Sequence, residues 1–118
     1  MLILMAHGSP DPRWRASVEM LVTSVAAELG PGRVRLAYLA CAPTLPDVAA
    51  EAARGGAQVI RVLPLFLAFP GHVERDIRPL VAQVRQAHYP VEVELLPPLG
   101  QHPLFRELLQ RIAAEEPE

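Results

Sequence analysis

The chain has 118 residues, of which 51% are hydrophobic, and a formal net charge of −2 at pH 7. This length suits a single domain over residues 1–118, with enough apolar residues to bury a core. The charge gives no electrostatic reason to expect a nucleic acid or an anionic membrane as partner. Because Cys41 is the single cysteine, an internal disulfide and a metal site built from several cysteines are excluded.

The first half of the chain contains two predicted strands, each followed by a helix. Residues 2–6 form an apolar run that has no basic leader and ends at a His-Gly-Ser turn, which indicates a strand and neither a signal peptide nor a membrane span. A helix is predicted from Asp11-Pro12 to a stop at Gly30. A second strand is predicted over 34–40, and then a helix from an N-cap at Thr44 to Gly55. We expect a soluble, cytoplasmic protein.

The second half of the chain repeats this alternation. Strands are predicted over residues 59–67 and 91–96. Ile77 to Val84 follow a helical period, and Pro79 is tolerable there only if Asp76 lies near the N-cap. Pro103 opens a last helix. Its apolar residues fall on one face: Leu104, Phe105, Leu108, Leu109 and Ile112.

Four strand–helix units in succession predict a parallel sheet with helices on both faces. The runs at 2–6 and 59–67 are almost continuously apolar, as central strands are, whereas the run at 91–96 alternates as an edge strand does. The strand order 2-1-3-4 satisfies both observations. This α/β, three-layer, flavodoxin-like order places a ligand crevice at the carboxyl ends of the first and third strands.

Two histidines fall at that crevice. His7 directly follows the first strand, and His72 lies just beyond the third in Phe-Pro-Gly-His. Adjacent parallel strands are about 5 Å apart, so both side chains are expected at one rim of the sheet. Two neutral imidazoles can bind Co²⁺, Ni²⁺, Fe²⁺ or Zn²⁺ there. The alternative for each is a loop histidine held by a hydrogen bond.

Three motifs resemble those of one family: His-Gly-Ser after the first strand, Pro-Leu-Phe-Leu at 64–67 followed by Gly71-His72, and Leu-Gly-x-His-Pro at 99–103. With these motifs, nearly the whole chain is similar to the short class II chelatases, the sirohydrochlorin cobaltochelatase family. The resemblance implies a chelatase-like fold and a lyase that inserts a divalent metal into sirohydrochlorin or a related tetrapyrrole of cobalamin biosynthesis. Co²⁺ is the expected metal, with Ni²⁺ or Fe²⁺ as alternatives.

The resemblance further implies that His7 and His72 bind the incoming metal as catalytic residues, and that the enzyme is a homodimer. The metal is then a substrate, and no organic cofactor is expected. Many relatives carry a Glu in the loop after the second strand, but residues 38–43 contain no carboxylate. Proton acceptance therefore falls to a histidine, to Glu74 or to solvent. Cys41, at the same rim, is either a soft metal ligand or a packed thiol.

The remaining site residues are predicted from their position beside the two histidines. Sirohydrochlorin carries eight carboxylates, which Arg side chains at the rim can bind. The predicted substrate contacts are Ser9, Arg13, Arg75, Phe69 and His102. Asp76 and Glu74 are predicted to orient His72. The apolar run at 65–69 has three interpretations that stay open: a face for the macrocycle, a dimer contact near the two-fold axis, or core.

Two other functions fit the same residues. His7 at a strand-to-helix turn can act as the nucleophile of a phosphoryl-transfer enzyme, with backbone amides of Gly8 and Ser9 holding phosphate; such enzymes usually have Arg before the His, and here it is Ala6. A metal or tetrapyrrole carrier without turnover is the non-catalytic alternative. Imidazole ligands admit several first-row ions, so the residues select neither the physiological metal nor the pathway that receives the product.

Overall fold

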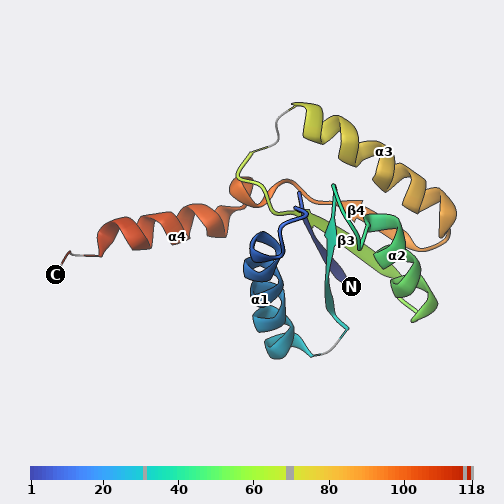
Figure 1. The fold of residues 1–118 in the computed structure, drawn as a ribbon, viewed down its shortest axis with the longest axis horizontal. Helices are drawn as coiled ribbons and strands as arrows, with labels where there is room; N and C mark the ends of the chain where they lie inside the picture. The colour runs from blue at the N-terminus through green and yellow to red at the C-terminus, as the bar shows by residue number, and fades with distance from the viewer. Residues whose placement is uncertain (31, 69–70, 116, 118) are drawn as a thin grey trace.

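Four parallel strands form one sheet in the order β2-β1-β3-β4 (Figure 1), which confirms the predicted topology. The computed structural model describes residues 1–30, 32–68, 71–115 and 117, with the backbone alone at 72 and 73. The strands are β1 (Leu2–Ala6), β2 (Val34–Tyr38), β3 (Val59–Pro64) and β4 (Glu92–Leu95). The helices are α1 (Pro12–Leu29), α2 (Leu45–Arg54), α3 (Gly71–Ala87), the 3₁₀ turn η1 (Leu99–Gln101) and α4 (Pro103–Ala114).

The apolar pattern of each strand explains its place in the sheet. In the central strands β1 and β3, alternate residues belong to the core that α2 and α3 cover: Ile3, Met5, Ile60 and Val62. Leu4 and Ala6 of β1 are buried as well. In the edge strand β4, Val93 is buried and its neighbours Glu92 and Glu94 are exposed. Three strands are shorter than predicted, because prolines that cannot donate to the ladder end β3 and follow β4. The loop after β2 turns back through a bond from Tyr38 N to Pro43 O (2.8 Å).

The first two helices begin and end where the sequence predicts. The Asp11 side chain accepts a hydrogen bond from Arg13 N (2.9 Å) at the start of α1, and Gly30 ends that helix. Thr44 Oγ1 accepts from Asp47 N (3.4 Å) at the start of α2, and Gly55 follows its last residue. These signals act within four or five residues of chain, which is why the sequence is sufficient to locate them.

The predicted start of the third helix was wrong. Helix α3 begins at Gly71, so Asp76 lies in its second turn and is no N-cap, and Pro79 lies in the helix interior. The missing N–H of Pro79 removes one helical bond. The helix continues because Ile77, Val81 and Val84 are buried against the sheet, and packing of an apolar face outweighs local propensity. His72 consequently belongs to the first turn of a helix and not to a loop.

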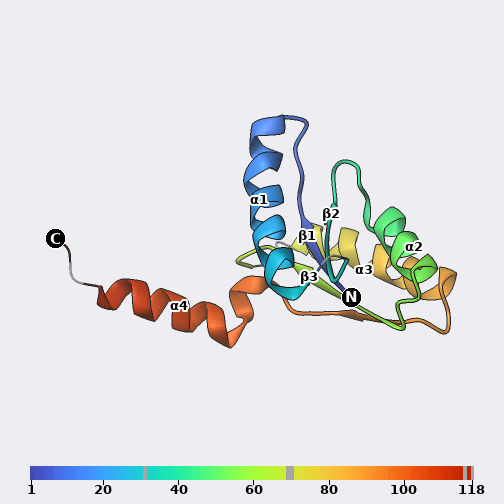
Figure 2. The same cartoon turned by 90° about the horizontal axis from the view of Figure 1, so that it is seen from below.

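The two faces of the sheet are covered unequally. Helices α2 and α3 pack on one face, and α1 lies along β2 on the other (Figures 1 and 2). Helix α4 extends away from the sheet and gives the molecule a length of 52 Å. The radius of gyration is 15.3 Å, whereas about 13.5 Å is typical of a compact domain of this length. No helix in the described part of the chain is long and apolar enough to cross a membrane.

Candidate functional site

His7 lies at the carboxyl end of β1, between the ends of β2 and β3, as predicted. Its side chain is exposed, and its Nδ1 is 3.1 Å from the Gly8 carbonyl oxygen. The loop that carries it is held by the neighbouring loop: Leu39 N donates to Ala6 O (2.9 Å), and Ala40 N donates to His7 O (2.8 Å). The backbone of His7 is therefore fixed by two strands while its imidazole is free to bind a ligand from solvent.

Gly8 is required by the geometry of this loop. Its φ is +89°, and a Cβ atom at this position would lie 2.8 Å from Cys41 Sγ and 3.0 Å from Tyr38 Cβ. Ser9 continues the turn, because its hydroxyl accepts from Asp11 N (3.1 Å) and its carbonyl accepts from Arg15 Nη1 (2.9 Å). The Gly-Ser pair after the histidine thus has a structural role. Gly8 lets the backbone approach the end of β2 closely, and Ser9 holds the turn that leads into α1.

We expect Gly8→Ala to destabilise the fold more than Gly56→Ala, which serves as its control. Both glycines have a φ near +90°, but an added Cβ at Gly56 meets nothing within 4 Å. Each change adds strain of about 1 kcal/mol from the positive φ, and overpacking at Gly8 adds about 1–3 kcal/mol. Urea unfolding of both variants measures the difference. Equal losses of unfolding free energy would show that Cys41 and Tyr38 move aside freely.

A cavity of about 410 Å³ opens beside His7 between α1 and the ends of β1 and β3. Its lining is mostly apolar, and it comprises Ala6, His7, Gly8, Ser9, Trp14, Arg15, Val18, Tyr38, Leu65 and Phe66. Trp14 stands at the mouth with 73% of its surface exposed. A volume in this range with few polar groups is typical of a small-molecule site, and the apolar walls suit a flat organic ligand.

Of two polar residues beside this cavity, Tyr38 was not predicted from the sequence, and Arg15 was predicted only as one of the arginines that flank the histidine loops. Tyr38 is buried, and its hydroxyl donates to Glu19 Oε1 of α1 (3.2 Å). Burial raises the pKa of Tyr38, and the nearby Glu19 carboxylate raises it further, so this phenol stays protonated at neutral pH. Arg15 is also part of the lining. The helical position of Arg15 and the alternation along β2 are the signals that place both side chains on the cavity side.

The second predicted ligand, His72, lies in the helix that follows β3, the strand next to β1. Met5 of β1 pairs with Pro64 of β3, so the chain segments that lead to His7 and into α3 leave adjacent strands. Leu65 and Phe66 are half-buried, and Leu67 is 69% exposed. The His72 side chain and the whole of Phe69 lie outside the described residues. The pairing of the two imidazoles, and the contact of Phe69 with substrate, stay predictions.

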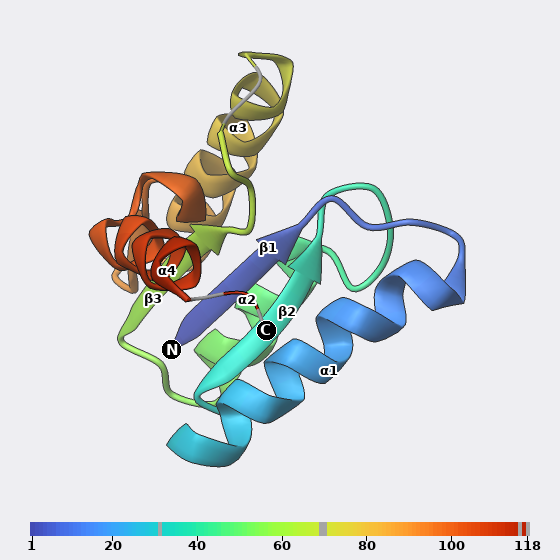
Figure 3. The same ribbon diagram turned by 90° about the vertical axis from the view of Figure 1, so that its left-hand side faces the viewer.

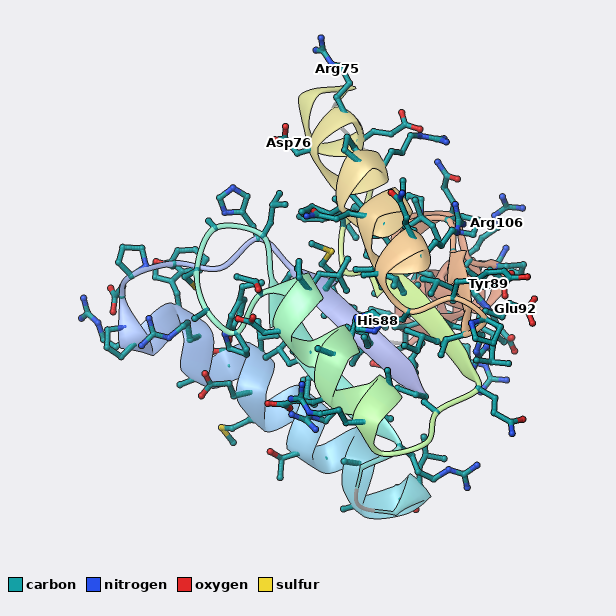
Figure 4. All side chains as sticks on the ribbon, turned by 90° about the vertical axis from the view of Figure 1, so that its right-hand side faces the viewer. Arg75, Asp76, His88, Tyr89, Glu92 and Arg106 are labelled. Carbon is teal, nitrogen blue, oxygen red and sulfur yellow. The ribbon has the colours of Figure 1, made fainter. Side chains whose placement is uncertain are left out.

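The other predicted residues on α3 lie at its exposed amino-terminal end. Glu74 accepts two hydrogen bonds from Arg78, from Nε (2.9 Å) and Nη2 (2.6 Å). Arg75 and Asp76 are both exposed at the tip of the helix, where Arg75 Nε donates to Gly71 O (3.2 Å) (Figure 4). Figure 4 also shows His88 at the end of α3 opposite to Arg75 and Asp76.

Arg13 and His102 bind other groups and do not line the cavity beside His7. The Arg13 guanidinium is 91% exposed and pairs with Asp11 (3.1 Å), and its hydrogen bonds are the main reason why the pKa of Asp11 lies below its usual value. His102 Nδ1 accepts from Leu104 N (3.1 Å) and thereby caps α4. Its ring lines a different cavity, beside Leu2 and Arg61 in the amino-terminal half of the central strands. Substrate contacts of both residues stay predictions.

Cys41 packs against the His7 loop. The residue is half-buried, and its Sγ atom is 3.9 Å from Ser9 O and faces Gly8. Within the described residues, no group of three or more His, Cys, Asp or Glu side chains is close enough to hold a metal ion. A metal at His7 therefore needs ligands from outside this set, such as His72, the substrate or solvent.

Known proteins are similar to this chain in sequence and in fold. The sequence model of the CbiX family matches residues 1–116. The sirohydrochlorin cobaltochelatase of Methanopyrus kandleri is 36% identical over 78 residues, which cover 64% of this chain and 54% of that protein. The matched region thus spans about half the length of this relative.

Solved structures extend the comparison to the fold. The cobalamin (vitamin B12) biosynthesis CbiX protein of Marinobacter aquaeolei VT8 has a TM-score of 0.80 and 27% identity, over 95% of this chain and 92% of that one. The sirohydrochlorin chelatase SirB of Bacillus subtilis subspecies spizizenii, solved with cobalt, has a TM-score of 0.77 at 18% identity, over 95% of this chain and 49% of SirB. At that identity the match establishes the fold alone. From the family match over residues 1–116 and the shared architecture, the chain belongs to the CbiX family.

Proposed function

We propose that the protein is a chelatase that inserts a divalent metal, Co²⁺ in the first place, into sirohydrochlorin or a related tetrapyrrole. The observation that carries the proposal is the exposed His7 imidazole at the end of a central strand, beside an apolar cavity. Family membership supports it, as does the name of the Methanopyrus relative. SirB structures that contain cobalt or Fe³⁺ are consistent with several metals as substrate for this fold.

The hydrogen bonding of His7 suits a metal ligand. A carbonyl oxygen can only accept, so the contact of Nδ1 with Gly8 O (3.1 Å) favours the tautomer with the proton on Nδ1. Nε2 then carries the free lone pair, and the bond to the carbonyl holds the ring in place. We propose that Nε2 of His7 and the imidazole of His72 bind the incoming metal together, and that the metal exchanges its water molecules stepwise for pyrrole nitrogens.

We propose that the macrocycle binds in the apolar cavity beside His7. Trp14 and Leu65 both line the cavity, and their aromatic and aliphatic surfaces can stabilise a flat ligand by burial. Arg15 uses Nη1 for Ser9 O and retains other N–H groups for a substrate carboxylate. Insertion releases two pyrrole protons. Once the metal has left Nε2 of His7 and the ring of His72, each neutral imidazole again has a free lone pair and can accept one of these protons. We propose a homodimer, because one rim of one sheet encloses a macrocycle on one side alone.

The direct test is metal insertion by the purified protein. Sirohydrochlorin and Co²⁺ are mixed with and without protein, and the visible spectrum of the tetrapyrrole is followed. We expect a protein-dependent rise in the rate of metalation. A change in the spectrum on binding without faster metalation would favour a carrier. Hydrolysis of p-nitrophenyl phosphate, measured in parallel, would favour phosphoryl transfer instead.

We expect metalation to become faster as the pH rises from about 5.5 to 7.5. An ordinary imidazole loses its proton in this range, and only the neutral form has a lone pair for the metal. The rate of metalation is lower at low pH because protons compete with the metal for the imidazole lone pair. Initial rates at fixed free Co²⁺ in buffers that do not bind metal provide the measurement. A rate that does not change between pH 5 and pH 8 would contradict histidine ligation in the rate-limiting step.

A further inference from the structure

A second cavity, of about 580 Å³, lies between α3 and the chain that follows β4. Four residues at spacings of three or four along α3 form one wall: Glu74, Arg78, Val81 and Arg85. The segments after β3 and β4 form the rest, as far as Gln101 of η1. In contrast to the cavity beside His7, most of its lining is polar. We call this cavity the α3 cleft.

Arg85 presents a fixed guanidinium to the α3 cleft. Its Nε donates to the Val93 carbonyl oxygen of β4 (2.8 Å), and this hydrogen bond is partly buried. Among the described residues, no atom accepts a hydrogen bond from Nη1 or Nη2 of Arg85. A planar guanidinium that is held at Nε loses little conformational freedom when a carboxylate binds to its free side. Arg85 is therefore prepared to bind an anion from solvent.

Arg78 is oriented by Glu74, its neighbour one turn earlier in α3. Nε and Nη2 of Arg78 both donate to Glu74 Oε1 (2.9 and 2.6 Å), whereas Nη1 donates to no atom of the described residues. The side chains of this pair are 68% and 38% exposed, respectively. An exposed ion pair contributes little free energy, so an anion in the α3 cleft can compete with Glu74 for the guanidinium.

The charges and composition of the α3 cleft favour an organic anion. Two arginines outnumber the single carboxylate, Glu74, so the lining is positive in a chain whose net charge is −2. Guanidinium groups bind carboxylates through pairs of parallel hydrogen bonds. Leu96 and Pro97 add apolar surface for the carbon atoms next to such a group. We propose that the α3 cleft is a binding site for the carboxylates of an organic acid.

The position of the α3 cleft gives this carboxylate two sources. Helix α1 lies along β2, whereas α3 contacts β4 at the opposite edge of the sheet (Figure 3). Phe66 lines the cavity beside His7 and Ala68 lines the α3 cleft, so the segment after β3 separates the two. One source is a peripheral carboxylate of a macrocycle bound at His7, and the other is a free carboxylic acid from solution. The first source rests on the chelatase function proposed above, and the second does not.

The first test is the binding of succinate, followed by the amide signals of α3 and Gln101 in two-dimensional NMR spectra. We expect succinate to shift these signals in the wild type. Arg78→Gln and Arg85→Gln should each raise the Kd about 5-fold, the upper range for an exposed charge pair. Arg85→Lys keeps the charge but not the planar fork, so its Kd should lie between those of Arg85→Gln and the wild type. Arg54→Gln, in the last turn of α2, is the charge-matched control and should bind as the wild type does.

Glu74→Gln is expected to have the opposite effect, which damage to the fold does not produce. The change removes a charge that repels the ligand and releases Arg78 from its ion pair. The affinity for succinate should therefore rise, by about 3-fold for an exposed pair. An affinity that is unchanged or lower in Glu74→Gln would contradict the role of Arg78 in the α3 cleft. Circular dichroism checks that each variant is folded.

The second test identifies the source of the carboxylate by titration with metal-free sirohydrochlorin. Trp14 is the single tryptophan and lines the cavity beside His7, so quenching of its fluorescence reports a bound tetrapyrrole. If a carboxylate of the tetrapyrrole occupies the α3 cleft, both Arg→Gln variants raise the Kd of sirohydrochlorin, and succinate competes with it. If the ligand is a free acid, these variants lose affinity for succinate and bind sirohydrochlorin as the wild type does.

One result of the two titrations overturns the proposal. If the variants of Arg78 and Arg85 bind both ligands as tightly as Arg54→Gln does, the α3 cleft is not a carboxylate site. Failure of the chelatase function would be recognised separately. A wild type that neither binds nor metalates sirohydrochlorin would contradict that function, while the succinate titration would still decide whether the α3 cleft binds carboxylates.

Discussion

Replacement of His7 with alanine is expected to reduce the rate of cobalt insertion by about 100-fold or more and to leave the fold intact. The side chain is exposed, and its Nδ1 contacts the Gly8 carbonyl oxygen, so little packing is lost. The rate falls because the incoming metal loses a ligand and the pyrrole protons lose an acceptor, and general acid–base groups contribute typically 10²–10⁴-fold. Initial rates from the visible spectrum, together with unfolding in urea, separate catalysis from stability.

His72→Ala is expected to have a loss of similar size, and the double variant is expected to be little worse than either single one. Residues that act as a unit are not additive, because removal of the first already disables the site. His88→Ala is the control, since His88 lies at the far end of α3 (Figure 4), and it should keep the wild-type rate. Losses that multiply in the double variant would indicate two independent roles and would contradict a shared metal site.

The largest effect on stability is expected from Gly100→Ala. A Cβ atom at Gly100 would lie 1.8 Å from the Leu67 carbonyl oxygen and 2.5 Å from Leu67 Cα. Backbone atoms cannot rotate away as the end of a side chain can, so η1 must separate from the segment after β3. Overpacking costs about 1–3 kcal/mol and occasionally more. We expect a loss of about 3 kcal/mol in unfolding free energy, measured in urea, and a fall in Tm of roughly 10–20 °C.

Gly55→Ala is the matched control for this change. An added Cβ at Gly55 has ordinary contacts of 3.5 Å with two helix carbonyls, and its φ of −78° suits alanine. Its stability should stay close to that of the wild type. Because the displaced segment leads from β3 to His72, Gly100→Ala should also slow metalation. A Gly100 variant as stable as the Gly55 variant would show that the contact between η1 and β3 relaxes at little cost.

Much of the fold could be predicted from the sequence, because local signals or simple periodicity determine it. Strand order followed from the continuous apolar run of β1 and β3 and the alternation in β4, and the structure confirms it. The ends of α1 and α2 followed from Asp11, Gly30 and Thr44, whose side chains or backbone act within one turn. The position of His7 at the carboxyl end of β1 followed from the predicted end of that strand at Ala6.

The tertiary structure decided what depends on contacts between distant segments. Local propensity placed the start of α3 near Asp76, but the helix begins at Gly71. It continues through Pro79 because Ile77 and Val81, on either side of the proline, are buried. Arginines flanking the histidine loops were visible in the sequence, yet only the packing of α1 on β2 puts Arg15 rather than Arg13 into the lining of the cavity.

Helix α4 shows most clearly which features the sequence predicts and which depend on the tertiary structure. Its periodicity identified the apolar face at Leu104 and Leu108, and the structure confirms the helix. A periodic pattern states which side chains share a face, but the surface that covers them depends on the direction in which the helix leaves the sheet. That direction is set by the contact of Gly100 with Leu67, between residues far apart in the chain. The sequence alone therefore determined that α4 has one apolar face, and the three-dimensional arrangement decided that no residue of this helix is buried.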